Sequence, residues 1–216
     1  MSDILIIGTG GLAREFVSQF SGYAGAPRVL GFRSTDPSEH SRFGLPGFFV
    51  QGDITPDGVG TDQAVIAIGT GAVRRRIHAE LKSWGFTFPS LVHPSSVVSG
   101  KVVLGEGVVI APQCVVSPDV VIGAFSYLNF CCGIGHDVTI GSYVQINPGC
   151  QIGGAVAIDD ESLIGSGSTL MQRIRVGSGA TVASGSVVFA SVDAGATVLG
   201  NPARRMRALE KDTGPS

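Results

Sequence analysis

An unbroken six-residue repeat constrains the fold of this chain more than any other feature. From Val98 every sixth residue is aliphatic as far as Val188, and Gly frequently follows it, as in Ile122-Gly123 and Ile134-Gly135. Helices repeat about every 3.6 residues and single strands about every 2, so neither produces this pattern. Short strands joined by tight corners, three to a coil, do produce it. We therefore predict a parallel β-helix with the aliphatic residues inside and Gly relaxing the corners.

Composition and charge argue against two classes of partner. The chain has 216 residues, a net charge of −2 and only 15% charged residues. A surface that binds nucleic acid is usually basic, so we expect no nucleic-acid partner. No apolar run is long enough to span a bilayer, and the start, MSDILIIGTGG, lacks a basic region and a cleavage site. We expect a cytoplasmic protein without membrane insertion.

Three of the four cysteines, Cys114, Cys132 and Cys150, are spaced by 18 residues, which is one coil of the predicted β-helix. They should therefore stack about 4.8 Å apart, the spacing of neighbouring strands. The stack could be a thiolate metal site or a ladder of small buried thiols. We favour the ladder, because free cysteine packs as a small hydrophobe.

The N-terminal part reads as alternating strands and helices. Residues 3–7 form a buried strand, Gly8-Thr9-Gly10-Gly11 a turn, and residues 12–17 a short amphipathic helix. Such a turn exposes backbone N–H groups that suit phosphate, although it can equally be a tight turn that binds nothing. A second strand follows at 28–32. Asp36 then lies roughly where a dinucleotide fold places its ribose-binding acid.

The next segment, 38–60, reads as a loop with a short strand near 48–50. A buried strand at 64–69 and a helix at 72–84 complete a unit that could hold one nucleotide but would be cramped for NAD. Arg74, nearest the start of this helix, is a candidate phosphate ligand. The alternative is that it lies on a solvated helix face.

One histidine, His136, lies inside the repeat. A β-helical zinc hydratase of the gamma carbonic anhydrase type needs three converging imidazoles, so we expect no metal. His136 is followed by Asp137, a pairing that suits a general base and its orienting carboxylate. Gly154 lies one coil further, about 4.8 Å away, where its N–H could bind an oxyanion. The plain alternative is a solvent-exposed His-Asp pair.

Several motifs together resemble the hexapeptide-repeat acyltransferases. The resemblance is to the branch that holds sialic acid O-acetyltransferases and N-acetyltransferases of nucleotide-linked amino sugars. It covers nearly the whole chain and rests on Gly8-Thr9-Gly10-Gly11, Leu30-Gly31-Phe32, Ala67-Ile68-Gly69 with Arg74, Leu91-Val92-His93-Pro94, Ile134-Gly135-His136-Asp137, Ile146-Asn147-Pro148-Gly149 with Gly153-Gly154, and Gly200-Asn201-Pro202-Ala203.

The resemblance implies a Rossmann-like sugar-nucleotide-binding domain at 1–88, a linker at 89–96, a left-handed parallel β-helix at 97–199, and a cap and tail at 200–216. It also implies a homotrimer with acetyl-CoA between chains. His136, Asp137 and Gly154 would be catalytic. The implied cofactor site comprises Gly153, Gly154, Gly200, Asn201, Pro202, Ala203 and Arg204, and the implied substrate site comprises Gly8, Thr9, Gly10, Gly11, Leu12, Arg33, Asp36, Gly69 and Arg74.

Three departures from this family leave the acceptor open. Leu12 stands where the amino-sugar enzymes usually carry His, Arg33-Ser34 where they carry a pair of acids, and Gln145 where many carry a second His. The leading hypothesis is acetyl transfer from acetyl-CoA to the amine of a nucleotide-linked amino sugar. The alternatives are O-acetylation of a sialic-acid-like sugar or another hydroxyl acceptor, a longer acyl donor, and a non-catalytic trimeric nucleotide-binding scaffold.

Overall fold

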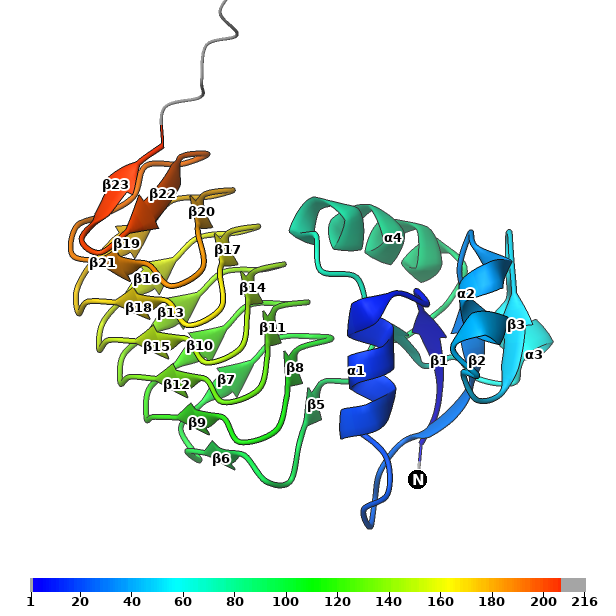
Figure 1. Ribbon diagram of the computed structural model, residues 1–216. Coiled ribbons are helices and arrows are strands. Elements are labelled where there is room, and N and C mark those ends of the chain that lie inside the picture. The colour runs from blue at the N-terminus through cyan, green and yellow to red at the C-terminus, as the bar shows by residue number, and fades with distance from the viewer. Residues whose placement is uncertain (1, 207–216) are drawn as a thin grey trace, which may run out of the picture.

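The structure is a computed structural model that describes residues 2–206 (Figure 1). The rest of the expected C-terminal tail lies outside the described residues. The N-terminal part is a parallel sheet in the order β3-β2-β1-β4. Its strands are β1 (Asp3–Ile7), β2 (Arg28–Arg33), β3 (Phe48–Val50) and β4 (Ala64–Ile66), and its longer helices are α1 (Gly11–Gln19) and α4 (Gly71–Ser83).

Strand β1 is buried on both faces, which explains its continuous apolar run. Ile4 and Ile6 pack in one cluster with Phe16 of α1. Leu5 and Ile7 point the other way and join a second cluster that contains residues of α4. Helices therefore cover both faces of the sheet, as a doubly wound parallel sheet requires.

The prediction that residues 38–60 form a loop with one strand is wrong in part, because two short helices flank β3. Helix α2 (Pro37–Arg42) is capped by the Asp36 carboxylate, which accepts a hydrogen bond from the Ser38 N–H at 2.8 Å. Helix α3 (Pro56–Val59) is capped in the same way by Thr55. Asp-Pro and Thr-Pro are N-cap and first-turn signals for helices, so the sequence carried this information.

The second part is a parallel β-helix with three sheets. Sheet I contains β5, β8, β11, β14, β17, β20, β22 and β23, sheet II contains β6, β9, β12, β15, β18 and β21, and sheet III contains β7, β10, β13, β16 and β19. The strand bounds are β5 Leu91–Val92, β6 Val97–Val98, β7 Val103–Leu104, β8 Val109–Ile110, β9 Val115–Val116, β10 Val121–Ile122, β11 Tyr127–Leu128, β12 Gly133–Ile134, β13 Thr139–Ile140, β14 Gln145–Ile146, β15 Gln151–Ile152, β16 Ala157–Ile158, β17 Leu163–Ile164, β18 Thr169–Leu170, β19 Arg175–Val176, β20 Thr181–Val182, β21 Val187–Val188, β22 Thr197–Gly200 and β23 Ala203–Arg205.

The predicted register is confirmed coil by coil. Ile134 pairs with Ile152, and Ile122 pairs with Ile140, each 18 residues apart. The aliphatic side chains of the repeat form one continuous interior cluster. Burial of these side chains is the dominant stabilising contribution to this part of the chain.

The glycines that follow the aliphatic residues have a different role from the one predicted. A left-handed backbone occurs three residues after the aliphatic position, for example at Asp137 with φ 59°. The glycines sit where successive coils touch. A Cβ on Gly135 would lie 2.7 Å from the Gly154 nitrogen, and one on Gly123 would lie 2.5 Å from the Gly141 carbonyl carbon. Close stacking of backbones, and not a special φ, requires glycine there.

The cysteine ladder is confirmed, because Cys114, Cys132 and Cys150 are all buried free thiols. Each donates a hydrogen bond to a carbonyl one coil on, at 3.1 to 3.3 Å. Cys131 is exposed. Within residues 2–206, no group of three or more His, Cys, Asp or Glu side chains is placed to hold a metal ion.

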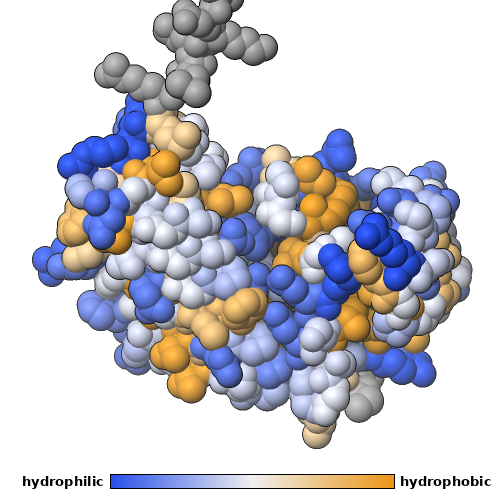
Figure 2. Space-filling model, in the orientation of Figure 1, coloured by the Kyte–Doolittle hydropathy of each residue, from blue (hydrophilic) through white to orange (hydrophobic). Residues whose placement is uncertain are grey.

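Sheet I of the β-helix packs against the N-terminal part (Figure 1). Val109, Ala111 and Tyr127 of the β-helix share a buried cluster with α1 and the sheet. Hydrophobic residues also show in the hollow between the two parts (Figure 2). None of the helices in the described range is long and apolar enough to cross a bilayer.

Candidate active site

His136 lies at the edge of the β-helix between sheet II and sheet III, in the corner that joins β12 to β13. Each coil visits sheet I, sheet II and sheet III in turn, so this edge is opposite sheet I. The corner column continues with Gly154 and Gln172 in the next two coils. The six-residue repeat therefore places His136 on the side of the β-helix that is remote from its own N-terminal sheet.

The imidazole of His136 is oriented by the neighbouring carboxylate. Its Nδ1 lies 2.6 Å from Asp137 Oδ2, and both side chains are largely exposed, at 70% and 60%. An ionised carboxylate can only accept a hydrogen bond, so Nδ1 carries the proton and the lone pair is on Nε2. The left-handed turn at Asp137 brings its carboxylate back to the preceding residue.

Gly154 leaves the space that the imidazole occupies. A Cβ at Gly154 would lie 2.7 Å from His136 Nε2 and 2.9 Å from Cε1. The Gly154 N–H makes no hydrogen bond to another protein group within the described part of the chain. The predicted juxtaposition of His136 and Gly154 is therefore present, with Nε2 facing the glycine.

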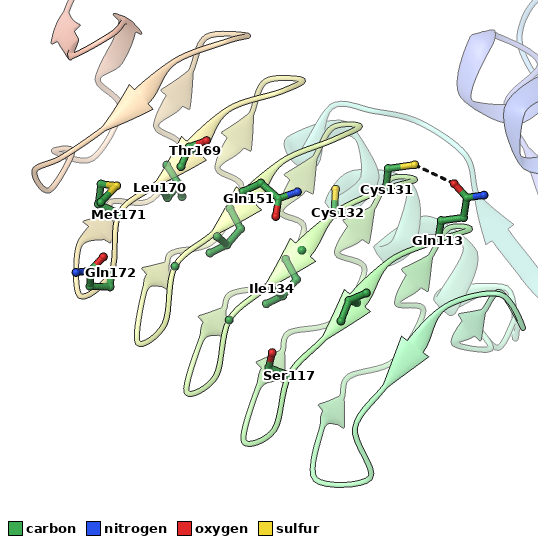
Figure 3. Close-up of a pocket in the computed structure, with 15 residues that line it drawn as sticks. Gln113, Ser117, Cys131, Cys132, Ile134, Gln151, Thr169, Leu170, Met171 and Gln172 are labelled. Carbon is green, nitrogen blue, oxygen red and sulfur yellow. Dashed lines mark hydrogen bonds between the residues drawn. The ribbon is translucent and has the colours of Figure 1, made fainter.

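A groove of about 580 Å³ runs across the outer face of sheet II and reaches this edge (Figure 3). Gly135 and Gly153, next to His136 and Gly154, form part of its wall. Polar groups from several coils line it, as the labelled side chains show: Gln113, Ser117, Cys131, Gln151, Thr169 and Gln172. The groove therefore has an apolar floor and several separate hydrogen-bonding groups, which suit an extended ligand.

The predicted cofactor residues at the C-terminal end lie in a hairpin formed by β22 and β23, which contains the cis peptide bond between Asn201 and Pro202. Ala203 and Arg204 line a cavity of about 270 Å³ at this end of the β-helix, together with Ala190. Ala190 is in the same corner column as His136, three coils further, which is roughly 14 Å at about 4.8 Å per coil. The cavity therefore touches the His136 edge at Ala190, whereas the β22–β23 hairpin on its other side belongs to sheet I.

One of the predicted substrate glycines, Gly8, lines a crevice at the carboxyl ends of the N-terminal strands. The sheet order reverses between β1 and β4, which is where parallel α/β sheets bind ligands. A crevice of about 210 Å³ lies there and is lined by Gly8 and Ile68. Gly10 and Gly11, at the start of α1, have open space on the Cα side.

The polar groups of four residues predicted to bind substrate, Thr9, Arg33, Asp36 and Arg74, are engaged by other parts of the protein. Thr9 is buried, and its hydroxyl donates to Glu39 Oε2 at 2.7 Å. Arg33 lines the crevice, but its guanidinium donates to Glu80 and to the Gly52 carbonyl. Asp36 caps α2.

Arg74 is the clearest correction. It is 2% exposed, and its guanidinium donates hydrogen bonds to carbonyl and amide oxygens between the two parts of the chain. It is therefore not available to a phosphate group. Arg76, two residues along α4, is the residue of that helix's arginine triplet that lines the crevice.

Sequence reasoning missed the part of the site that depends on how α4 is rotated. The triplet at 74–76 was visible, but which guanidinium faces the crevice depends on packing. Arg74 packs against the β-helix, Arg75 makes surface ion pairs with Asp160 and Glu161, and Arg76 remains for the crevice. Gln145, which stands in place of a family His, is buried and accepts from Arg74 at 2.9 Å.

No family model and no curated protein matches the sequence. Solved structures match it in fold over almost its full length. PerB from Caulobacter crescentus, in complex with CoA and GDP-perosamine, gives a TM-score of 0.87 at 25% identity, covering 96% of this chain and 98% of that chain. WeeI from Acinetobacter baumannii AYE gives 0.75 at 26%, covering 95% and 100%.

A third match is a histidine-to-alanine variant of GDP-perosamine N-acetyl transferase from Caulobacter crescentus, with CoA and GDP-perosamine. It gives a TM-score of 0.78 at 22% identity and covers 96% of this chain and 98% of that chain. These matches confirm the predicted fold class, an α/β unit followed by a left-handed parallel β-helix. They also confirm, at the level of structure, the resemblance to nucleotide-amino-sugar N-acetyltransferases of the hexapeptide-repeat family.

Proposed function

We propose that this chain is an acetyl-CoA-dependent N-acetyltransferase whose acceptor is the amine of a nucleotide-linked amino sugar. The observation that carries the proposal is the imidazole of His136, held by Asp137 with Nε2 facing Gly154 at the end of a ligand-sized groove. The full-length likeness to PerB, which was solved with CoA and GDP-perosamine, supports the two substrates.

His136 acts as the general base. The acceptor amine attacks the thioester carbonyl carbon, the N–C bond forms, and the C–S bond breaks to release the CoA thiolate. Nε2 takes the proton that the amine loses and passes a proton to the departing sulfur. Asp137 stabilises the imidazolium that forms in between, because its carboxylate accepts from Nδ1 at 2.6 Å.

Gly154 supports the same step in two ways. Its missing side chain lets the imidazole lie over the backbone of the next coil, and its N–H is free to donate to the oxyanion of the tetrahedral intermediate. Along the edge, Gly153 and the groove on sheet II would hold the pantetheine arm of acetyl-CoA. Gly200, Asn201, Pro202, Ala203 and Arg204 would hold the nucleotide end, near the C-terminal cavity.

The nucleotide of the acceptor would bind in the N-terminal crevice. Gly10 and Gly11 offer open backbone at the start of α1, where the helix dipole favours a phosphate, and Gly8 lines the crevice itself. Arg76 adds a positive charge to the wall. Gly69, in the loop between β4 and α4, leaves the approach open, since a Cβ there would meet nothing within 4 Å.

A homotrimer is part of the proposal, because one chain cannot complete the site. The crevice lies on the sheet I side and His136 on the opposite edge, so an acceptor bound to one chain must reach His136 of another. Exposed valines flank this edge on both sides, Val97 and Val115 on sheet II and Val103 and Val121 on sheet III. Apolar side chains on both sides of one edge suit a closed ring of subunits.

We place the reaction in the cytoplasm. All four cysteines of the chain are free thiols, the state that a reducing compartment maintains.

The test follows release of free CoA thiol while nucleotide-linked amino sugars and free sugars are offered with acetyl-CoA. We expect turnover with a nucleotide-linked amine, and a kcat about 10² to 10⁴ lower in His136→Ala, the usual contribution of a general base. His93→Ala is the control, since His93 packs on Phe20 and Tyr23 away from the edge.

Two results would contradict the proposal. A His136→Ala variant with kcat within tenfold of the wild type would remove the base role. Thermal stabilisation by a bare nucleotide but not by acetyl-CoA, with no turnover, would instead favour a non-catalytic nucleotide-binding scaffold.

A further inference from the structure

Arg74 is a buried cation without a carboxylate partner among residues 2–206. The side chain lies near the start of α4 and is 2% exposed, and within this range it makes hydrogen bonds only to neutral oxygens. Its donors reach six acceptors: the carbonyls of Ile68, Gly69, Phe125, Tyr143 and Val144, and Oε1 of Gln145. Burial lowers the pKa of Arg74 to about 10, so it is still charged at neutral pH.

The six acceptors belong to both parts of the chain. Ile68 and Gly69 follow β4 in the N-terminal part, and Nη1 donates to their carbonyls at 2.7 and 2.9 Å. The other four acceptors lie on two neighbouring coils of the β-helix, with distances of 2.9 to 3.1 Å. One guanidinium therefore ties the end of a sheet strand to the backbone of the β-helix.

The planar guanidinium is needed for this arrangement. Arginine presents five N–H donors in a rigid fork, whereas lysine has a compact ammonium with three. The acceptors approach from the loop between β4 and α4 and from two coils of the β-helix, and an ammonium cannot reach all of them. A buried charge that loses part of its hydrogen bonding is costly, so the geometry around Arg74 is tightly specified.

The neighbouring backbone shows the same close fit. A Cβ on Gly71, the first residue of α4, would clash with the Tyr143 carbonyl oxygen, which is one of the Arg74 acceptors. Helix α4 also carries Arg76 to the crevice, and Ile68 lines that crevice. The contacts of Arg74 thus reach the wall of the proposed nucleotide site through the main chain.

We infer that Arg74 is a positioning residue that holds the nucleotide crevice at one angle to the β-helix, and so sets where a bound acceptor amine reaches. The inference rests on the proposed function. Because each acceptor would meet His136 of another chain, a small change in this angle moves the amine relative to the base. Misplacement of reacting groups by about 1 Å can cost about 10²-fold in rate.

The test compares Arg74→Lys with Arg75→Lys in the full-length protein. Arg75 is on the same helix and also contacts the β-helix, but its ion pair with Glu161 is at the surface. We expect Arg74→Lys to lower kcat at least tenfold, while the Kd of a bare nucleoside diphosphate, measured by titration calorimetry, changes less than about threefold. Arg75→Lys should keep kcat within about twofold.

Scanning calorimetry provides a readout that does not depend on activity. We expect one unfolding transition in the wild type and two in Arg74→Lys, because the N-terminal part and the β-helix lose their coupling. If the wild type acetylates no nucleotide-linked amine, the proposed function fails, and calorimetry still decides whether Arg74 couples the two parts. Should Arg74→Lys not fold, Gly71→Ala displaces α4 from the same carbonyl and should give the same lowered kcat with unchanged nucleotide binding.

The inference is overturned if folded Arg74→Lys keeps a single transition at the wild-type Tm with kcat within twofold. It is also overturned if the wild type already unfolds in two independent transitions. An equal loss of kcat and nucleotide affinity would show that Arg74 merely maintains the crevice, and would likewise contradict a positioning role.

Discussion

Replacement of Gly154 by Ala should abolish most activity while leaving the fold intact. The added methyl group would lie 2.7 Å from His136 Nε2 and 2.9 Å from Cε1. Carbon atoms come into van der Waals contact at about 3.5 Å, so the ring must retreat by roughly 0.8 Å. The imidazole is 70% exposed, and it can swing outward without disturbing the core.

The size of the effect follows from this retreat. Movement of a reacting group by about 1 Å can cost about 10²-fold in rate, and complete loss of a general base costs about 10² to 10⁴. We therefore expect kcat of Gly154→Ala to fall about 10²-fold. The free energy of unfolding should change by no more than about 0.5 kcal/mol, as for other surface substitutions.

Two glycine variants serve as controls for this measurement, which combines thiol-release kinetics with denaturant unfolding. Gly100→Ala adds the same methyl group to the β-helix where nothing lies within 4 Å, so kcat and stability should both stay close to wild type. Gly153→Ala places Cβ at 2.7 Å from the Gln172 nitrogen, a backbone atom that cannot swing away. It should cost about 1 to 3 kcal/mol of stability, as overpacking does.

A Gly154→Ala variant with kcat within threefold of wild type would refute the reasoning, since Nε2 would not then need its position over the glycine. A large loss of stability in that variant would refute it as well, because the clash would have been relieved by the backbone and not by the imidazole.

Three further outcomes are expected. Asp137→Asn should lower kcat by about 10- to 100-fold with the fold unchanged, because Asn tolerates the left-handed φ of 59° but cannot hold the imidazolium; unchanged kcat would exclude the orienting role. Arg76→Ala should weaken calorimetric binding of a nucleoside diphosphate about tenfold, whereas Arg75→Ala should not, and equal effects would place the phosphate elsewhere. Burial lowers the pKa of His78, so the side chain is protonated more readily in the unfolded chain, and the free energy of unfolding should fall as the pH drops below about 6.5. His78→Phe should flatten that part of the dependence of unfolding free energy on pH. An unaltered dependence would show that His78 does not contribute.

The β-helix could be predicted from the sequence in detail, down to the stacking of Cys114, Cys132 and Cys150 and the pairing of His136 with Gly154. Every coil repeats the same local geometry, so the number of residues between two positions gives the distance between them along the β-helix. The one error within the repeat concerns why glycine follows the aliphatic position. Close contact between the backbones of neighbouring coils requires glycine at this position. The φ preferences of individual residues do not reveal such contacts.

The N-terminal part was less predictable because its site is made by packing between elements of different kinds. Residue types alone identified the glycine turn and an arginine triplet. Arg74 was expected at a phosphate and instead lies buried between the two parts, while Arg76 faces the crevice. Rotation of α4 decides this, and that rotation is set by contacts with coils some 70 residues further along the chain, as in the hydrogen bond from Arg74 to Gln145.

The sequence by itself therefore determined the β-helix, its register and the position of a histidine above a glycine. In a strict repeat, the residue number alone gives the coil and the position within the coil. Only the tertiary structure decided which face of the β-helix the N-terminal sheet covers. That face, sheet I, is opposite His136. Within one chain, the N-terminal crevice is therefore far from the imidazole of His136. The physical reason is that sheet I and α1 bury apolar surface only when they pack against each other. A local sequence pattern does not predict which two distant surfaces pack together.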